Sequence, residues 1–151
     1  YNIDESRIFE RGFEFIVNEV SGIKIGIMVC FEIRFPEVAR ILALKGSDVI
    51  VVPSNFTART GKHHWEPLLK ARAIENELFI VAVNETGTNR KTGVKSFGHS
   101  MVVNPWGETV LKAGVEEGLF IADLDISQIK TVRKRVPIFE LRRNDLYELR
   151  Y

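Results

Sequence analysis

This sequence has little cysteine, no long apolar run and no excess of charge of either sign. Cys30 is the only cysteine among 151 residues, which excludes an intrachain disulfide framework and any zinc or iron–sulfur site built from several cysteines. No apolar run reaches the roughly 18–20 residues of a membrane span, and the first residues lack the charged and then apolar pattern of a secretory signal. We therefore expect a reducing compartment, the cytoplasm, and no membrane partner.

The charges are nearly balanced, because 21 Lys and Arg stand against 20 Asp and Glu. Basic residues gather near the carboxyl end at Lys130, Arg133, Lys134 and Arg135, where a solvated helix face explains them better than nucleic-acid binding. Repeats, low-complexity tracts and flexible linkers are also missing, so no internal domain boundary is predicted. The chain begins at Tyr1 rather than at a methionine, and we expect it to be part of a longer protein.

Strand-like and helix-like segments alternate along the chain. The predicted strands cover residues 13–20, 23–29, 49–52, 78–83, 100–103, 108–112 and 119–124, and the predicted helices cover residues 36–45, 62–77 and 126–135. The tail after the last helix keeps several apolar side chains and is expected to pack on something. This order predicts an α/β fold with a mixed sheet, in which the strand at 49–52 is parallel and buried.

Reactive or polar residues follow three of the predicted strands. Cys30 comes directly after a strand and six residues before Pro36, so it lies on a strand-to-helix elbow, a geometry that exposes a nucleophile. Arg34, four residues later, could bind a substrate carboxylate with two hydrogen bonds. The other two strand ends carry residues 53–57 and 84–86. Ligands of open α/β sheets bind beyond the carboxyl ends of parallel strands, and we expect the substrate site there.

Plainer explanations exist for the same residues. A free cysteine is often a buried apolar side chain, and an arginine near Glu32 and Glu37 often forms a surface ion pair. His63 and His64 are not a metal site, because adjacent residues on a helix point in different directions and no third ligand follows at helical spacing. We interpret both as solvated residues at the start of a helix. Neither a metal nor an organic cofactor is predicted.

Six short segments together resemble the nitrilase superfamily of carbon–nitrogen hydrolases, and the resemblance covers nearly the whole chain. The segments are CFEIRFPE (residues 30–37), PSNF (53–56), HWE (64–66), ARAIEN (71–76), GHS (98–100) and NPWG (104–107). The first and third are most similar to the amidase branch, which includes omega-amidases and deaminated-glutathione amidases. The resemblance implies an α-β-β-α sandwich, with residues 1–151 as the carboxyl-terminal part of a single domain.

The resemblance also implies a Glu-Lys-Cys catalytic set and gives roles to residues of this chain. Cys30 would attack the amide carbon, and the main-chain N–H of Phe31 would help to hold the oxyanion. Glu5 matches an auxiliary glutamate that steadies the lysine, whereas the catalytic Glu and Lys themselves would precede Tyr1. Residues 1–151 alone are therefore expected to be inactive. The expected substrate-binding residues are Arg34, Asn55 and Phe56.

We expect hydrolysis of a small carboxylate-bearing amide through a thioester, with release of ammonia. Two alternatives stay open: a catalytically silent binding or assembly module, and a domain that hydrolyses glutamine or transfers the acyl group. The sequence does not strongly favour amides, carbamoyl compounds or nitriles over one another as the substrate. The resemblance further implies a homodimer or a higher even assembly in which the apolar tail reaches a neighbouring copy.

Overall fold

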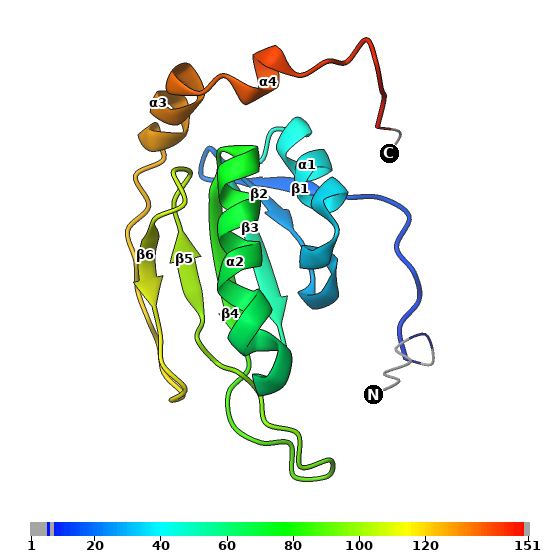
Figure 1. Ribbon diagram of the computed structural model, residues 1–151, viewed down its shortest axis with the longest axis vertical. Helices are drawn as coiled ribbons and strands as arrows, with labels where there is room; N and C mark the ends of the chain where they lie inside the picture. Colours follow the sequence, from blue (N-terminus) through cyan, green and yellow to red (C-terminus); the bar gives the residue numbers. More distant parts are fainter. Residues whose placement is uncertain (1–5, 7, 150–151) are drawn as a thin grey trace.

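The computed structural model describes residues 6 and 8–149, which build a six-stranded mixed sheet (Figure 1). The strands lie in chain order: β1 (Val17–Val20), β2 (Ile23–Ile27), β3 (Val49–Ser54), β4 (Phe79–Asn84), β5 (Met101–Val103) and β6 (Thr109–Lys112). β2, β3 and β4 are parallel to one another, whereas β1, β5 and β6 join the sheet by antiparallel pairing. The predicted α/β fold with a mixed sheet is confirmed.

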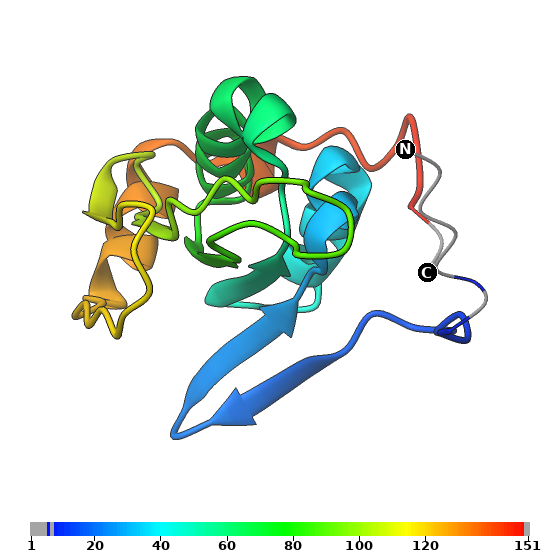
Figure 2. The ribbon, with the colours of Figure 1, turned by 90° about the horizontal axis from the view of Figure 1, so that it is seen from below.

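The helices are distributed unevenly over the sheet. Figures 1 and 2 show two helices on one face, and two others near the end at which β3 and β4 begin. The first pair is α1 (Pro36–Leu44) and α2 (Ala58–Asn76), and the second pair is α3 (Ser127–Arg135) and α4 (Ile138–Leu141). The parallel strands therefore point their carboxyl ends away from α3 and α4.

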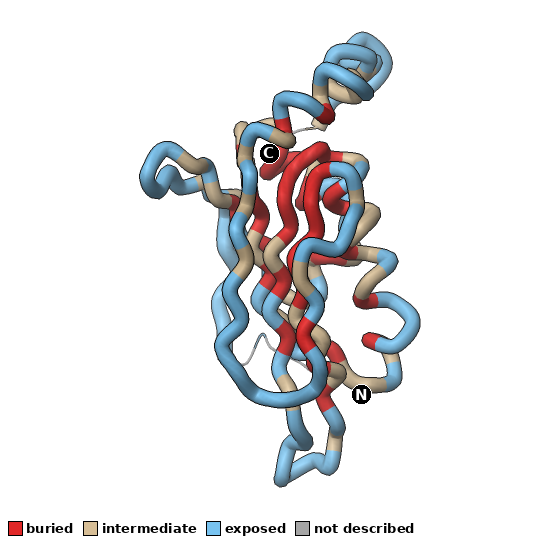
Figure 3. Tube along the Cα trace, turned by 90° about the vertical axis from the view of Figure 1, so that its left-hand side faces the viewer, coloured by how far each residue is buried: buried red, intermediate tan, exposed pale blue. Residues whose placement is uncertain are grey.

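The two faces of β3 and β4 differ in burial (Figure 3). Side chains alternate across a strand, and Ile50 and Ile80, on the face that α1 and α2 cover, are fully buried. On the opposite face, Ile129 of α3 packs against the first residue of each strand, whereas Val83 at the far end of β4 is 56% exposed. β3 and β4 are therefore buried on both faces, as expected for parallel strands, only at the end that α3 covers.

α2 is longer than the sequence predicted. The helix begins at Ala58 rather than at residue 62, because the side-chain oxygen of Thr57 accepts a hydrogen bond from the N–H of Thr60 at 3.5 Å and caps the first turn. Pro67 therefore lies inside the helix and not in its first turn, where it removes one main-chain hydrogen bond.

Most predicted strands agree with the structure to within two residues at each end, but two differ by more. Residues 119–124 form no strand: the segment runs alongside β6 (Figures 1 and 3) without a backbone ladder, and Leu119 and Ile121 are 89% and 81% exposed. Alternating apolar residues predicted a strand there, but this pattern does not ensure that the backbone forms hydrogen bonds with an adjacent strand. Residues 13–16 also lie outside β1, whose pairing with β2 begins at Val17 and Gly26.

The carboxyl tail packs on the domain at one aromatic residue. The ring of Phe139 contacts the guanidinium groups of Arg40 and Arg133, whose Cζ atoms are 4.9 and 5.1 Å from the ring centre. Leu141 and Leu146, in contrast, are 74% and 69% exposed. The expected packing of the tail is confirmed at Phe139 and not at these two residues.

Candidate active site

Cys30 lies on a strained elbow between β2 and α1. β2 ends at Ile27, a 3₁₀ helix spans Cys30–Arg34, and α1 begins at Pro36. The φ angle of Cys30 is +44°, in the left-handed region, which costs a residue with a side chain about 1–3 kcal/mol and which recurs at active sites. The thiol side chain is partly buried and borders the core without being enclosed in it. The structure forms the elbow that the sequence predicted.

Hydrogen bonds inside the elbow leave Arg34 without a carboxylate partner. Oε2 of Glu32 accepts a hydrogen bond from the N–H of Val29 at 2.6 Å. Among the residues that the structure describes, no salt bridge involves Arg34, so the surface ion pair with Glu32 or Glu37 is not formed. Within the same part of the chain, no group accepts a hydrogen bond from the N–H of Phe31.

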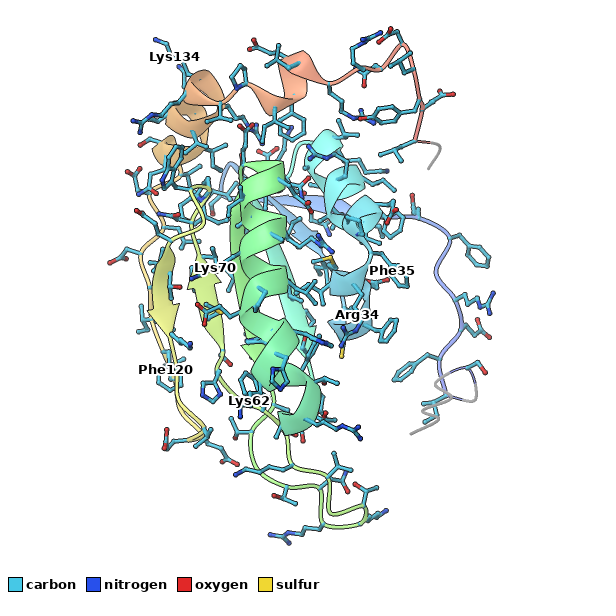
Figure 4. All side chains as sticks on the ribbon, viewed as in Figure 1. Arg34, Phe35, Lys62, Lys70, Phe120 and Lys134 are labelled. Atoms are coloured by element: carbon cyan, nitrogen blue, oxygen red, sulfur yellow. The ribbon has the colours of Figure 1, made fainter. Side chains whose placement is uncertain are left out.

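Three other side chains surround the guanidinium of Arg34. Its Cζ atom is 5.3 Å from the ring centre of Phe31 and 5.0 Å from that of Phe56, both within the range of cation–π contacts. Its Nη1 is 3.1 Å from Nδ1 of His64, which α2 contributes. Figure 4 shows Arg34 beside the lower turns of α2. His64 is exposed, as expected, but it is a neighbour of Arg34 and not merely a solvated residue.

Phe56, which follows β3, is buried and its ring packs against Arg34. It is 4% exposed, and its ring centre is 4.9 Å from that of Trp65. Its main-chain N–H donates a hydrogen bond to Oδ1 of Asn84 at 2.8 Å, and Nδ2 of Asn84 donates one to the carbonyl oxygen of Gly98 at 2.8 Å. Asn84 thus joins two loops at the carboxyl edge of the sheet. In the sequence, a side-chain amide that follows a strand of apolar residues indicated that Asn84 could have such a role.

The remaining predicted residues lie apart from this group or outside the described residues. Asn55 is exposed, and its Oδ1 accepts a hydrogen bond from Oγ of Ser96 at 2.9 Å. Glu5 lies outside the residues that the structure describes. Arg72, which the sequence did not single out, is 5% exposed and reaches the elbow from α2. A charged residue on the apolar face of a helix was the available signal for it.

A cavity of about 840 Å³ lies away from the elbow, on the open face of the sheet. It is bordered by β4, β5 and residues 113–122 with Leu124, and neither Cys30 nor Arg34 lines it. In Figure 4, Phe120, which lines the cavity, and Arg34 lie on opposite sides of α2. The cavity therefore belongs to the partly uncovered sheet face and not to the group around Cys30.

The described part of the chain has neither a cluster of metal ligands nor a helix suited to spanning a membrane. No three His, Cys, Asp or Glu side chains of residues 6 and 8–149 are grouped so that they could hold a metal ion. None of the helices in these residues is long and apolar enough to cross a membrane.

Comparison with known proteins identifies the family. A family model for carbon–nitrogen hydrolases matches residues 2–134, so the chain belongs to the carbon–nitrogen hydrolase family. It is 39% identical to omega-amidase NIT2 of Bos taurus over 145 residues, which are 96% of this chain and 52% of that protein. It is 43% identical to the deaminated glutathione amidase of Homo sapiens over 124 residues, which are 82% of this chain and 38% of that protein.

The fold agrees with solved structures of the family. The crystal structure of a carbon–nitrogen hydrolase from Helicobacter pylori G27 matches with a TM-score of 0.87 and 33% identity, over 95% of this chain and 55% of that one. The resemblance to the amidase branch of the nitrilase superfamily is thereby confirmed. The chain spans about half the length of the bovine and Helicobacter relatives.

Proposed function

We propose that the protein hydrolyses a non-peptide carbon–nitrogen bond in a small amide that bears a carboxylate. The observation that carries this proposal is the strained elbow at Cys30, four residues from an arginine that no described carboxylate neutralises. The similarity to an omega-amidase and to a deaminated glutathione amidase supports amide hydrolysis. A carboxylate-bearing substrate suits Arg34, because a guanidinium binds a carboxylate through two parallel hydrogen bonds.

The proposed reaction has two steps at the sulfur of Cys30. The thiolate attacks the amide carbon, a C–S bond forms, the C–N bond breaks, and the nitrogen leaves as ammonia after gaining a proton. Water then attacks the thioester, which releases the carboxylic acid and restores the thiol. The free N–H of Phe31 is suited to stabilise the negative oxygen that develops in both steps.

Several groups would have to come from outside the described residues. The family resemblance implies a proton-relaying Glu and an oxyanion-binding Lys upstream of Tyr1, with Glu5 steadying that Lys. We propose that an upstream half also supplies strands that cover the open sheet face, which completes the sandwich. A reducing cytoplasm would keep Cys30 as a thiol, and the exposed Leu141 and Leu146 suit an assembly of two or more copies.

Ammonia release by the full-length protein tests the proposal. Wild type and Cys30→Ala are incubated with monoamides of short dicarboxylic acids, with water as the only acceptor, and ammonia and the free diacid are quantified. We expect one ammonia per diacid from the wild type and a loss of at least about a hundredfold in the variant. Activity that survives in a folded Cys30→Ala protein would refute the role of the thiol, and an acyl product other than the free acid would indicate transfer rather than hydrolysis.

A further inference from the structure

The guanidinium of Arg34 is held by groups from three separate parts of the fold. Phe31 comes from the 3₁₀ helix, Phe56 from the segment after β3, and His64 from α2. Arginine has a long side chain that loses rotamer entropy when it is held in one conformation. Contacts that already restrict the Arg34 side chain in the free protein reduce the conformational entropy that is lost when a substrate binds.

The contact between Arg34 and His64 has a defined polarity. A guanidinium carries only hydrogen-bond donors, so Nδ1 of His64, 3.1 Å from Nη1, has to be the acceptor. This requires a neutral imidazole with its hydrogen on Nε2. His64 therefore uses one N–H of Arg34 and fixes the direction of the guanidinium, while the other N–H groups have no partner among the described residues.

The nearest competing carboxylate is engaged elsewhere. Glu32 lies two residues from Arg34, but its Oε2 accepts the hydrogen bond from Val29 at 2.6 Å. A fixed guanidinium with free N–H groups and no internal counter-ion is suited to an anion from outside. The partner that best matches its planar, forked geometry close to Cys30 is the carboxylate of a substrate.

We propose that His64 is a positioning residue that sets selectivity for amides with a carboxylate, by holding Arg34 in the orientation that binds it. The inference rests on the proposed amide hydrolysis and names which residue adjusts its substrate preference. His64 acts through Arg34 and not on the reacting atoms. Its removal should therefore weaken recognition of the carboxylate more than it affects the chemical step.

The test compares two substrates of equal length in the full-length protein. Succinic acid monoamide carries the carboxylate, and butyramide lacks it. For His64→Ala we expect the ratio of kcat/KM for the acidic amide over the neutral one to fall about threefold to tenfold, mainly through KM for the acidic amide. His64→Gln should recover most of the ratio, because the side-chain carbonyl of glutamine can accept the hydrogen bond from Arg34.

Two controls separate positioning from a general structural effect. His63→Ala changes the adjacent exposed histidine, which has no described contact with Arg34, and should leave the ratio unchanged. In an Arg34→Ala background, the change at His64 should have no additional effect on the ratio, because the two residues act as one unit. Circular dichroism and thermal melts verify that each variant is folded.

The outcomes are distinguishable. A ratio in His64→Ala within twofold of the wild type, or equal losses on both amides, would overturn the inference while leaving amide hydrolysis in place. An effect of the His64 change that persists in full without Arg34 would overturn it as well. If the wild type hydrolyses neither amide nor any other monoamide tested, the proposed function fails and the inference fails with it.

Discussion

Arg72 donates a hydrogen bond from its Nε to the carbonyl oxygen of Ile33 at 2.9 Å, and so joins α2 to the 3₁₀ helix that begins at Cys30. Its Nη1 also pairs with Oε1 of Glu75 at 2.8 Å. The Arg72 side chain is buried, so its hydrogen bond to Ile33 is protected from water. This hydrogen bond connects the centre of the domain to the elbow. The elbow is therefore held by the long helix as well as by its own hydrogen bonds.

We predict that Arg72→Leu lowers the free energy of unfolding by about 2 kcal/mol, because the carbonyl oxygen of Ile33 loses a charged donor in a buried position. Urea denaturation of the full-length protein measures this. Lys70→Leu is the matched control on the same helix: Lys70 forms an ion pair with Glu66, and both side chains are 36% exposed, so a change below about 1 kcal/mol is expected. Equal effects of the two substitutions would contradict the role of Arg72.

The positive φ angle of Cys30 predicts an unusual effect of glycine. Cys30→Gly should unfold with a free energy about 1 kcal/mol higher than Cys30→Ala, because glycine adopts the left-handed region without the penalty of a Cβ atom. Thermal melts and urea denaturation compare the two variants. Ala71→Gly in α2, where the backbone is helical, should instead lower stability by about 1 kcal/mol. A Cys30→Gly variant less stable than Cys30→Ala would show that the elbow is not strained.

How far the elbow and the fold follow from the sequence depends on how local the interactions are. An apolar strand followed by Cys30 and then by Pro36 predicted the elbow, since each part is a property of neighbouring residues. The contact between Arg34 and His64 spans 30 residues, and no spacing rule connects a loop arginine with a helix histidine. It depends on how α2 packs against the 3₁₀ helix, which only the folded chain defines.

The early part of α2 gives a second example. The helix includes Gly61, which precedes the predicted start at residue 62, and a Cβ at this position would be 2.3 Å from Cγ of Phe97. The glycine thus makes room for an aromatic ring from a distant loop. The wrong strand at residues 119–124 has the opposite cause: the local pattern is typical of a strand, but the segment runs alongside the edge strand β6 without forming a backbone ladder with it.

Acid should weaken the contact between α2 and β6. Hydrogen bonds from Lys112 and then Lys70, at 2.6 and 2.8 Å, lower the pKa of Glu66 to about 2. A carboxylate with a lowered pKa stabilises the fold at pH values above its pKa in the unfolded chain, about 4.3, and this contribution is lost as the pH falls toward 2. The three side chains are more than a third exposed, so the effect is below about 1 kcal/mol.

Glu66→Gln tests this pH dependence. We expect the variant to be less stable than the wild type at pH 7, with a difference that shrinks below about pH 4.3 and disappears near pH 2. Urea denaturation at pH 7, 4 and 2.5 gives the three values. Glu37→Gln, at an exposed carboxylate with no described ion pair, should show no comparable trend. A difference for Glu66→Gln that is the same at all three pH values would contradict the ion-pair explanation.

Phe139 should control how tightly the carboxyl tail is attached. Replacing it with alanine removes two cation–π contacts, each worth about 0.5–1 kcal/mol, so the tail should open more often. Limited trypsin digestion should then cut after Arg142 or Arg143 roughly tenfold faster than in the wild type. Leu141→Ala, at a largely exposed side chain, is the control and should be cut at the wild-type rate. Equal cutting rates for all three proteins would show that Phe139 does not anchor the tail.

Trapping of the acyl-enzyme tests whether the reaction passes through a thioester at Cys30. The full-length protein is mixed with a monoamide of a short dicarboxylic acid, quenched in acid within the first turnover, digested and analysed by mass spectrometry. The mechanism predicts that the peptide containing Cys30 gains the mass of the acyl group, that ammonia appears at the same rate, and that Cys30→Ala shows neither. Ammonia release without any acylated Cys30 peptide, together with undiminished turnover in Cys30→Ala, would contradict it.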